Sequence, residues 1–297
     1  MCKKIIVIKG DTTLTDKIIE SLEEGNNNVF VSVNTIEDLY TYKNNYKNCI
    51  ENNKLLDNNI MADTDLIINC FSPINEEYQT LYDYLQFFEC IVLKAIDKKV
   101  KGIINISSQQ VYGNIKNTPA YEIENLHPNN PLALIQIACE SIGWALTRNT
   151  QTKLTSIRMA ELVGIEYKDS FIYKMISNAK RNKQLNIENP NNVPGFINIK
   201  DATEGLFEFI KNCDYKDWKA MYNLGKEPDY SYTLKNIAEY IKKSAKKWSN
   251  IDIEITINEN NNEQKTTTMD SHWFYQDSNW KPKISIIQSI EELYNSI

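Results

Sequence analysis

The stretch 4-KIIVIKGDTTLTDKIIESLEEGNNNVFVSV-33 decides the fold class. It begins with the apolar run 4-KIIVI-8 and ends with a second apolar run, 29-VFVSV-33. Between the two, the segment 13-TLTDKIIESLEE-24 repeats its apolar residues at the spacing of a helix. A strand, a helix and a second strand in this order form the first unit of a parallel sheet that carries helices on its faces.

The same alternation of strand and helix continues along the chain. Further apolar runs predict strands at 65–71, 102–108 and 153–159, and helical spacing predicts helices at 78–99 and 131–147. We therefore predict an α/β protein, in which a Rossmann-like, doubly wound parallel sheet is followed by a smaller C-terminal α/β lobe. Sheets of this kind bind ligands at the carboxyl ends of their strands.

The pattern becomes less regular after residue 164. We expect a Rossmann-like domain at 1–165 and a substrate-type lobe at 166–297, interleaved and packed as one unit. The cleft between them offers a place for a small-molecule ligand. The elements predicted in the second part are helices at 171–182, 201–212 and 233–248 and strands at 196–199 and 251–257.

The charge of the chain excludes several kinds of partner. The formal net charge is −6 over 297 residues, and the sequence pI is near 5.2. Nucleic acids and anionic membranes attract clustered lysine and arginine, so we expect neither as a partner. No apolar run is long enough to span a membrane, and the six cysteines have no CxxC spacing. These features favour a cytoplasmic protein with reduced thiols.

The order of the elements and several local motifs resemble one enzyme family. This is the extended short-chain dehydrogenase/reductase family, in its NAD-dependent epimerase/dehydratase branch that acts on nucleotide sugars. The resemblance covers nearly the whole chain and implies a Rossmann-like fold. The stretches that carry it are 102-GIINISSQQVYG-113, 128-PNNPLALIQIACE-140, 156-SIRMAELVG-164, 196-FINIKDATEGLFEFI-210, 222-YNLG-225 followed by 231-SYTLKNIAEYI-241, and 280-WKP-282.

The resemblance implies that NAD or NADP binds at a turn with three glycines after the first strand. Lys9, Thr12 and Thr15 stand at those three positions, and only Gly10 nearby is a glycine. A β-branched threonine is disfavoured where the backbone needs a positive φ, and Asp11 adds negative charge beside the expected pyrophosphate. We expect the usual dinucleotide site to be lost, although Lys9 and the helix N-terminus could still attract an anion.

Two further positions of the implied cofactor site differ from the family. The residue that ends the second strand, normally acidic and bound to the adenosine ribose, falls near Ser32 or Asn34. Either side chain can form a hydrogen bond, so this difference leaves ribose binding open. Phe71 stands where the family has a small residue beside the cofactor, which is a steric objection to cofactor binding.

The family's chemistry requires a hydroxyl that polarises the substrate, a tyrosine base, and a lysine that lowers the pKa of that tyrosine. Ser108 matches the hydroxyl, but the tyrosine and lysine positions hold Leu132 and Gln136. Leucine cannot exchange a proton, and glutamine carries no charge. Tyr112 or Tyr121 remains as a possible substitute base.

Substrate and metal ligands are also missing. In the family, an asparagine and an arginine hold the diphosphate of the sugar nucleotide, and the resemblance places Glu161 and Pro194 at these positions. A carboxylate repels phosphates, and proline has no donor. We interpret Arg158 as a structural residue at a strand end. We expect no metal site, because His127 and His272 have no partner at ligand spacing.

The predicted helices 78–99 and 131–147 are apolar on almost every side, which requires burial on every side. In the family the corresponding helices pair across a dimer axis, so we expect a homodimer or heterodimer through them.

The sequence leaves two candidate functions open. The first is a family member without standard oxidoreductase activity that binds, regulates or scaffolds, with nucleotide-sugar or surface-polysaccharide metabolism as its candidate setting. The second is an active NAD(P)-dependent nucleotide-sugar epimerase, dehydratase or reductase with divergent site residues.

Overall fold

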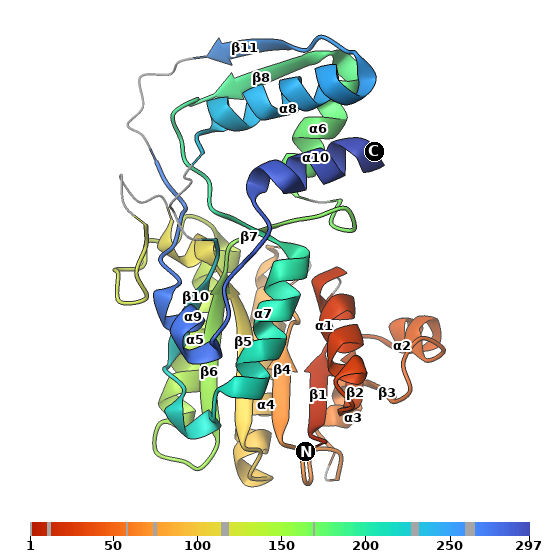
Figure 1. The fold of residues 1–297 in the computed structure, drawn as a ribbon. Coiled ribbons are helices and arrows are strands. Elements are labelled where there is room, and N and C mark those ends of the chain that lie inside the picture. The colour runs from red at the N-terminus through yellow and green to blue at the C-terminus, as the bar shows by residue number, and fades with distance from the viewer. Residues whose placement is uncertain are drawn as a thin grey trace.

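A computed structural model describes residues 2–10, 13–57, 59–73, 76–113, 119–168, 170–226, 232–258 and 265–297. Its centre is a seven-stranded sheet in the order β10-β6-β5-β4-β1-β2-β3, in which every neighbouring pair is parallel (Figure 1). The predicted α/β fold with a doubly wound parallel sheet is therefore confirmed. The strands are β1 (Lys4–Ile8), β2 (Asn28–Val33), β3 (Cys49–Glu51), β4 (Leu66–Asn69), β5 (Gly102–Ser108), β6 (Lys153–Met159) and β10 (Met221–Leu224).

Helices cover both faces of this sheet because its strands are apolar on both sides. In β1, Ile5 and Val7 join one hydrophobic cluster, whereas Ile6 and Ile8 join another. The first cluster receives α1 (Thr13–Glu24), α7 (Ile199–Asn212) and α9 (His272–Ser278), and the second receives α4 (Tyr78–Asp97) and α5 (Pro131–Thr147). The short helices α2 (Ile36–Tyr42) and α3 (Asn52–Leu55) flank β3, and η1 (Gln109–Tyr112) and η2 (Tyr215–Asp217) are single turns.

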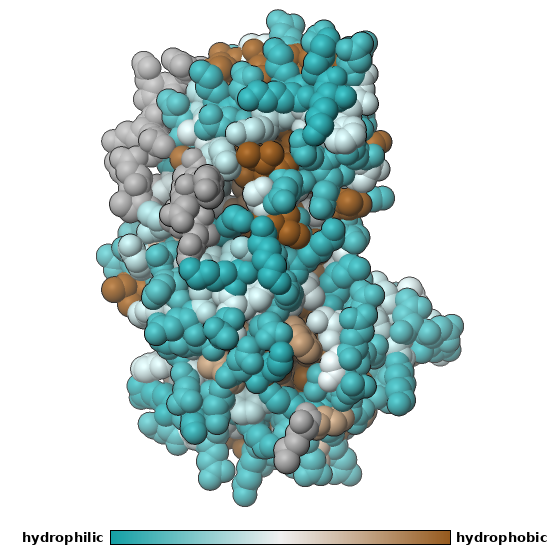
Figure 2. All heavy atoms as spheres, in the orientation of Figure 1, coloured by the Kyte–Doolittle hydropathy of each residue, from teal (hydrophilic) through white to brown (hydrophobic). Residues whose placement is uncertain are grey.

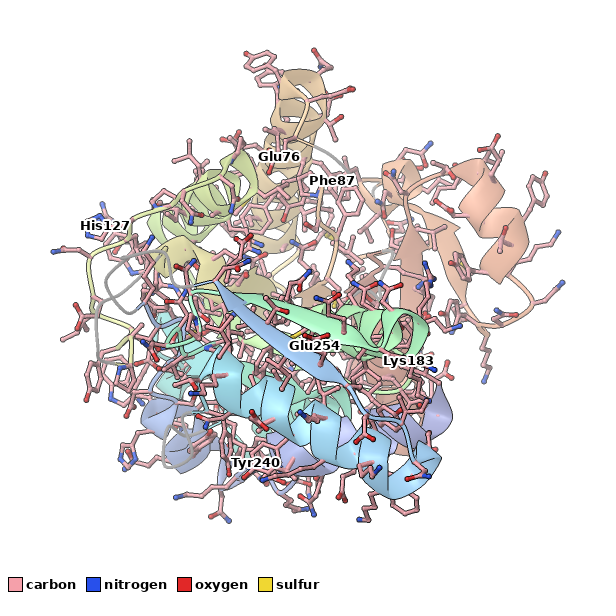
Figure 3. All side chains as sticks on the ribbon, turned by 90° about the horizontal axis from the view of Figure 1, so that it is seen from above. Glu76, Phe87, His127, Lys183, Tyr240 and Glu254 are labelled. Atoms are coloured by element: carbon pink, nitrogen blue, oxygen red, sulfur yellow. The ribbon has the colours of Figure 1, made fainter. Side chains whose placement is uncertain are left out.

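A third hydrophobic cluster holds the smaller lobe together. It combines buried residues of α6 (Phe171–Asn182), α8 (Leu234–Ser249) and α10 (Ile286–Ser296) with those of β8 (Gln184–Glu188). Figure 3 looks down on the parallel pair formed by β8 and β11 (Glu254–Asn258), with Lys183 and Glu254 labelled. A short parallel pair of β7 (Glu161–Val163) and β9 (Phe196–Asn198) connects this lobe to the large sheet.

Chain segments from both expected parts build the large sheet. After β9 the chain returns to it through α7 and β10, and later through α9, before α10 ends in the smaller lobe (Figure 1). The chain therefore passes between the two parts several times, and the smaller lobe lies beyond the carboxyl ends of the strands. None of the described helices is both long and apolar enough to cross a bilayer.

Candidate functional site

The turn after β1 is organised around a buried lysine. The Lys9 side chain is only 3% exposed, and its Nζ lies 2.6 Å from Oδ1 of Asp16 in the first turn of α1. The same ammonium lies 4.7 Å from the ring centroid of Tyr42 at the end of α2. The cation at the first glycine position is therefore neutralised inside the protein and is not presented to a phosphate.

Asp16 connects this lysine to a pair of aromatic rings. Its carboxylate also accepts a hydrogen bond from the hydroxyl of Tyr46, and the rings of Tyr46 and Tyr42 stack 5.9 Å apart. Burial and the neighbouring carboxylate of Asp16 raise the pKa of the Tyr46 phenol above its ordinary value. Together these contacts hold the segment after α2 against the start of α1.

The remaining described residues of the turn pack against β4. A Cβ added to Gly10 would lie 2.2 Å from the carbonyl oxygen of Cys70, so only glycine fits there. Thr15 is fully buried inside α1 and does not have a positive φ, so the backbone conflict expected for this threonine is wrong. Instead, its side chain forms a hydrogen bond with the Cys70 thiol. Asp11 and Thr12 lie outside the described residues.

The two positions proposed for the ribose differ in accessibility. The Ser32 hydroxyl is buried and donates to Oδ1 of Asn52 at 2.6 Å, whereas Asn34 is exposed beyond the end of β2. Phe71 packs on α4, where its ring lies 5.5 Å from the ring of Tyr84 and 5.9 Å from that of Phe87. Ser32 is therefore closed to a ligand, whereas Phe71 is half-buried and Asn34 is exposed.

These described residues do not fit the phosphates of a dinucleotide. Anion sites at helix N-termini use free N–H groups and nearby cations. Here Asp16 neutralises the ammonium of Lys9, and Gly10 is held against the carbonyl of Cys70.

The helix expected to carry catalysis is well formed. Asn130 caps α5 by accepting from the N–H of Ala133 at 2.8 Å, and proline occupies its first turn. Leu132 and Gln136 lie one turn apart and are half-buried, and Oε1 of Gln136 has no hydrogen-bond partner in the described part of the chain. Ser108 caps η1 by accepting from the N–H of Gln110 at 3.2 Å.

The two tyrosines considered as substitute bases have different surroundings. The Tyr112 hydroxyl donates to Oδ1 of Asn223 at 2.7 Å and accepts from Nη1 of Arg158 at 2.8 Å. Burial raises the pKa of Tyr112 to about 12, so this phenol stays protonated at neutral pH. Tyr121 is 48% exposed and, together with Trp273, lines a surface pocket of about 200 Å³.

Arg158 is a structural residue, as its position at a strand end suggested. Its Nη2 lies 2.6 Å from Oε2 of Glu140 on α5, and both side chains are almost fully buried. Ser107 of β5 donates to Oε1 of the same glutamate at 2.7 Å. Sequence reasoning missed Glu140, and no spacing rule would have paired this helix residue with a strand residue.

The two positions that the resemblance assigns to substrate anchors make different contacts. Oε1 of Glu161 accepts from the N–H of Phe171 at 2.7 Å, at the start of α6, and burial raises the pKa of this carboxyl. Pro194 lines a cavity of about 40 Å³ between the lobes, and Glu161 is not among the residues around it. The carboxylate therefore stabilises a helix end instead of facing the cavity.

A groove along β8 was not predicted. It has a volume of about 470 Å³ and is lined by the whole of β8, by one face of α6 and by Leu234. The carbonyl of Lys183 accepts from the N–H of Glu254 in β11. Because main-chain groups alternate along a strand, those of Gln184 and Asn186 point away from β11 and toward the other edge. This edge supplies backbone donors and acceptors for a polar ligand.

Among the described residues, no three histidine, cysteine, aspartate or glutamate side chains gather closely enough to hold a metal ion.

A family model described as the NAD dependent epimerase/dehydratase family matches residues 13–225. No curated protein sequence matches the chain.

Several solved structures share the fold over nearly the whole chain. UDP-N-acetylglucosamine 4-epimerase from Bacillus cereus has a TM-score of 0.78 and 18% identity, covering 99% of this chain and 96% of that one. UDP-glucose 4-epimerase from Thermotoga maritima, solved with UDP-glucose, has a TM-score of 0.78 and 16% identity, with 99% and 98% covered. A dTDP-glucose 4,6-dehydratase from Streptomyces venezuelae has a TM-score of 0.76 and 13% identity, with 99% and 96% covered. Identities this low show a common fold alone.

Proposed function

The chain belongs to the NAD-dependent epimerase/dehydratase family, and we propose that it is a member without hydride-coupled proton transfer that acts as a binding protein. The observation that carries this proposal is the absence of a working base on α5. Leu132 and Gln136 occupy the tyrosine and lysine positions that the family resemblance assigns. Neither side chain can exchange a proton at neutral pH.

The environment of the alternative bases supports the same conclusion. A general base must reach the reacting group and must have a pKa near the working pH. The hydroxyl of Tyr112 is occupied by Asn223 and Arg158, and its pKa is raised instead of lowered. Lys9, the cation of the cofactor turn, is likewise occupied by Asp16. The proton-transfer positions and the cofactor turn are altered together, which one relocated residue does not explain.

We further propose that the ligand is a nucleotide sugar or a related polar molecule, bound in the groove along β8. The solved UDP-glucose 4-epimerase of the same fold was crystallised with UDP-glucose. In this chain the groove of about 470 Å³ lies between α6 and the open edge of β8, whose backbone can form hydrogen bonds without any particular side chain. A ligand can therefore bind although the diphosphate anchors are replaced.

The partner proposed here is a second copy of this chain. Both α4 and α5 keep large apolar side chains at the surface, which favours their burial against another apolar face. The two helices pack on each other and cover the same face of the sheet. A twofold axis through such a surface buries it against itself. The exposed side chains are Tyr78 at 79%, Tyr82 at 44%, Leu93 at 48%, Leu134 at 57% and Trp144 at 47%.

Turnover assays test the proposal. Purified protein is incubated with UDP-glucose, UDP-N-acetylglucosamine or UDP-glucuronic acid and excess NAD, and products are separated by chromatography. We expect no epimer or dehydrated sugar above the background of a no-enzyme control. Turnover by the unmodified chain, lost on Ser108→Ala, would instead establish the alternative of an active enzyme with divergent site residues.

A further inference from the structure

A surface pocket of about 200 Å³ lies beside β10, the edge strand of the large sheet, where the chain before α5 meets the start of α9. The two segments run side by side, because Ala120 and Met269 form a parallel bridge and the N–H of Asp270 donates to the carbonyl of Ala120 at 2.9 Å. Nδ2 of Asn223 in β10 donates to the carbonyls of Ala120 and Asp270, at 3.0 Å each. These contacts fix the shape of the pocket. Its walls are formed by Tyr121, Glu122, Ile123, Asp270, His272 and Trp273.

One part of the pocket wall is apolar and open to water. Ile123 is 83% exposed, Tyr121 is 48% exposed and Trp273 is half-buried. Such a group contrasts with an ordinary surface, as the mostly hydrophilic face drawn in Figure 2 illustrates. Aromatic rings have a partly negative face, which attracts C–H groups that carry a small positive charge. This part of the wall therefore favours a ligand with an apolar face that carries C–H groups.

The other part of the wall contains acceptors that the protein does not fill. Glu122 is only 4% exposed, and its Oε1 accepts from the N–H of Asn223 at 2.9 Å. Oδ1 of Asp270 accepts from the N–H of His272 at 3.0 Å. The second oxygen of each carboxylate, Oε2 and Oδ2, has no hydrogen-bond partner in the described part of the chain. Carboxylate oxygens only accept, and a largely buried one without a donor is unfavourable, so the pocket favours a ligand with hydrogens to donate.

Charge narrows the choice of ligand further. Burial raises the pKa of Glu122, and the nearby charge of Asp270 adds to this rise, so the two carboxylates lie close together. They would repel a phosphate or any other anion. A cation is not required either, because Nη1 of Arg158 donates to the main-chain carbonyl of Glu122 at 3.1 Å. Nζ of Lys219 lies 5.6 Å from the ring centroid of Trp273 and adds a second positive charge nearby. The pocket therefore suits a neutral ligand.

We propose that this pocket binds one neutral hexopyranose ring. Two hydroxyls of the sugar donate to Oε2 of Glu122 and Oδ2 of Asp270, and the C–H face of the ring rests on the aromatic side chains. A volume of about 200 Å³ equals the share of roughly seven water molecules in liquid water, which accommodates a single ring. Pockets for larger ligands measure about 300–1,000 Å³, so a whole nucleotide sugar does not fit. The site is separate from the groove along β8, with which it shares no lining residue.

The experiment titrates the full-length protein with sugars that carry no nucleotide. The indole N–H groups of the five tryptophans are labelled with nitrogen-15 and followed by NMR at constant ionic strength. The probes are the methyl glycosides of glucose, galactose and N-acetylglucosamine. We expect saturable millimolar binding of at least one of them, with the indole signal of Trp273 shifting most. The uronate of the sugar that binds has a carboxylate in place of one CH₂OH group, and should bind at least about tenfold more weakly because the two carboxylates repel it.

Two variants locate the contacts. Trp273→Leu removes the aromatic ring and Asp270→Asn removes a charged acceptor, and each should weaken binding of the neutral sugar at least about tenfold. Asp270→Asn keeps an oxygen for the N–H of His272 and should also reduce the preference over the uronate. Trp248→Leu and Asp252→Asn are the matched controls, because both residues are exposed in the smaller lobe, and sugar affinity should not change. If Trp273→Leu does not fold, Asp270→Asn and the comparison of the two ligands on the unmodified protein still decide.

Three results overturn the proposal. The first is no saturable shift of the Trp273 signal with any of the three glycosides, the second is equal binding of the neutral sugar and its uronate, and the third is unchanged affinity in folded Trp273→Leu. Glycerol, a neutral polyol without a ring, is titrated in parallel, and the same shifts with glycerol would show a general polyol effect and also overturn it. Because no probe carries a nucleotide, none of these results depends on whether the groove along β8 binds a nucleotide sugar.

Discussion

Glu140 of α5 and Arg158 of β6 form an ion pair, with 2.6 Å between Oε2 and Nη2, and their side chains are 5% and 2% exposed. Glu140 lies one helical turn after Gln136 and two turns after Leu132. The helix therefore keeps the buried contact that fixes it to the sheet, while the positions assigned to proton transfer hold residues that cannot perform it. The buried contact between α5 and β6 therefore does not depend on the residues assigned to proton transfer.

Removing one partner of this pair should destabilise the protein strongly. Glu140→Gln leaves the guanidinium of Arg158 buried without its countercharge, and such losses cost about 3–5 kcal/mol. The free energy of unfolding is measured by urea denaturation. Arg158→Met should cost a similar amount, and the double variant should lose less than the sum of the two. Additive losses would show that the pair does not couple α5 to β6.

At Lys9, packing should matter more than charge. Lys9→Met keeps the length of the side chain and leaves a carboxylate, Asp16, that is 48% exposed and can be hydrated, so we expect a loss of at most about 1 kcal/mol. Lys9→Gly restores the glycine that the family resemblance assigns but removes a buried side chain, and should cost about 2–5 kcal/mol. Both are compared in thermal and urea unfolding. A larger loss for methionine than for glycine would contradict the packing argument.

Glu161 should make stability depend on pH in the acid range. Burial raises its folded pKa above its unfolded value, so its contribution favours the folded state at low pH and is lost as the pH rises through the folded pKa. At neutral pH the negative charge on this half-buried carboxylate therefore lowers folding stability, although its oxygen still accepts from the N–H of Phe171. Glu161→Gln keeps an oxygen that accepts from the N–H of Phe171, and should equal or exceed the stability of the unmodified protein at pH 7. Its advantage should shrink toward pH 4, as measured by urea unfolding at each pH.

Self-association should depend on the exposed side of α5. Leu134→Lys and Trp144→Glu place charges in the surface proposed to pair with a second copy, and each should raise the dimer dissociation constant at least about tenfold. Trp248→Glu on α8 is the control, because this tryptophan is 49% exposed but lies in the other lobe. Sedimentation velocity across micromolar concentrations measures the effect. A monomeric unmodified chain at tens of micromolar would exclude the proposed partner.

Strong periodic signals made much of the fold predictable. The helices α1, α5 and α6 and the strands β5 and β6 have the bounds that their apolar spacing predicts. In contrast, α2 has no buried residues and β3 is only three residues long, so neither contains enough repeats to reveal a period. The strand β8 did carry a usable signal, because Leu185 and Ile187 alternate with polar residues and are the two that are buried.

The candidate site was less predictable than the fold. The family resemblance identified positions such as Leu132 and Pro194, but not what their neighbours do. Lys9 was considered as a possible anion ligand, whereas in the structure Asp16, seven residues later, neutralises it. That pairing depends on how α1 leaves the sheet. Likewise, the contact of Glu140 with Arg158 joins a helix to a strand, and no local spacing rule predicts it.

The most direct test of the account is calorimetric titration of the purified protein with NADH and with NADPH, after its absorbance spectrum has been checked for bound nucleotide. Because Lys9 is neutralised by Asp16 and the end of β1 is packed against β4, we expect no binding at millimolar cofactor. Micromolar binding of either cofactor, or nucleotide that copurifies with the protein, would contradict it and restore the case for an active oxidoreductase.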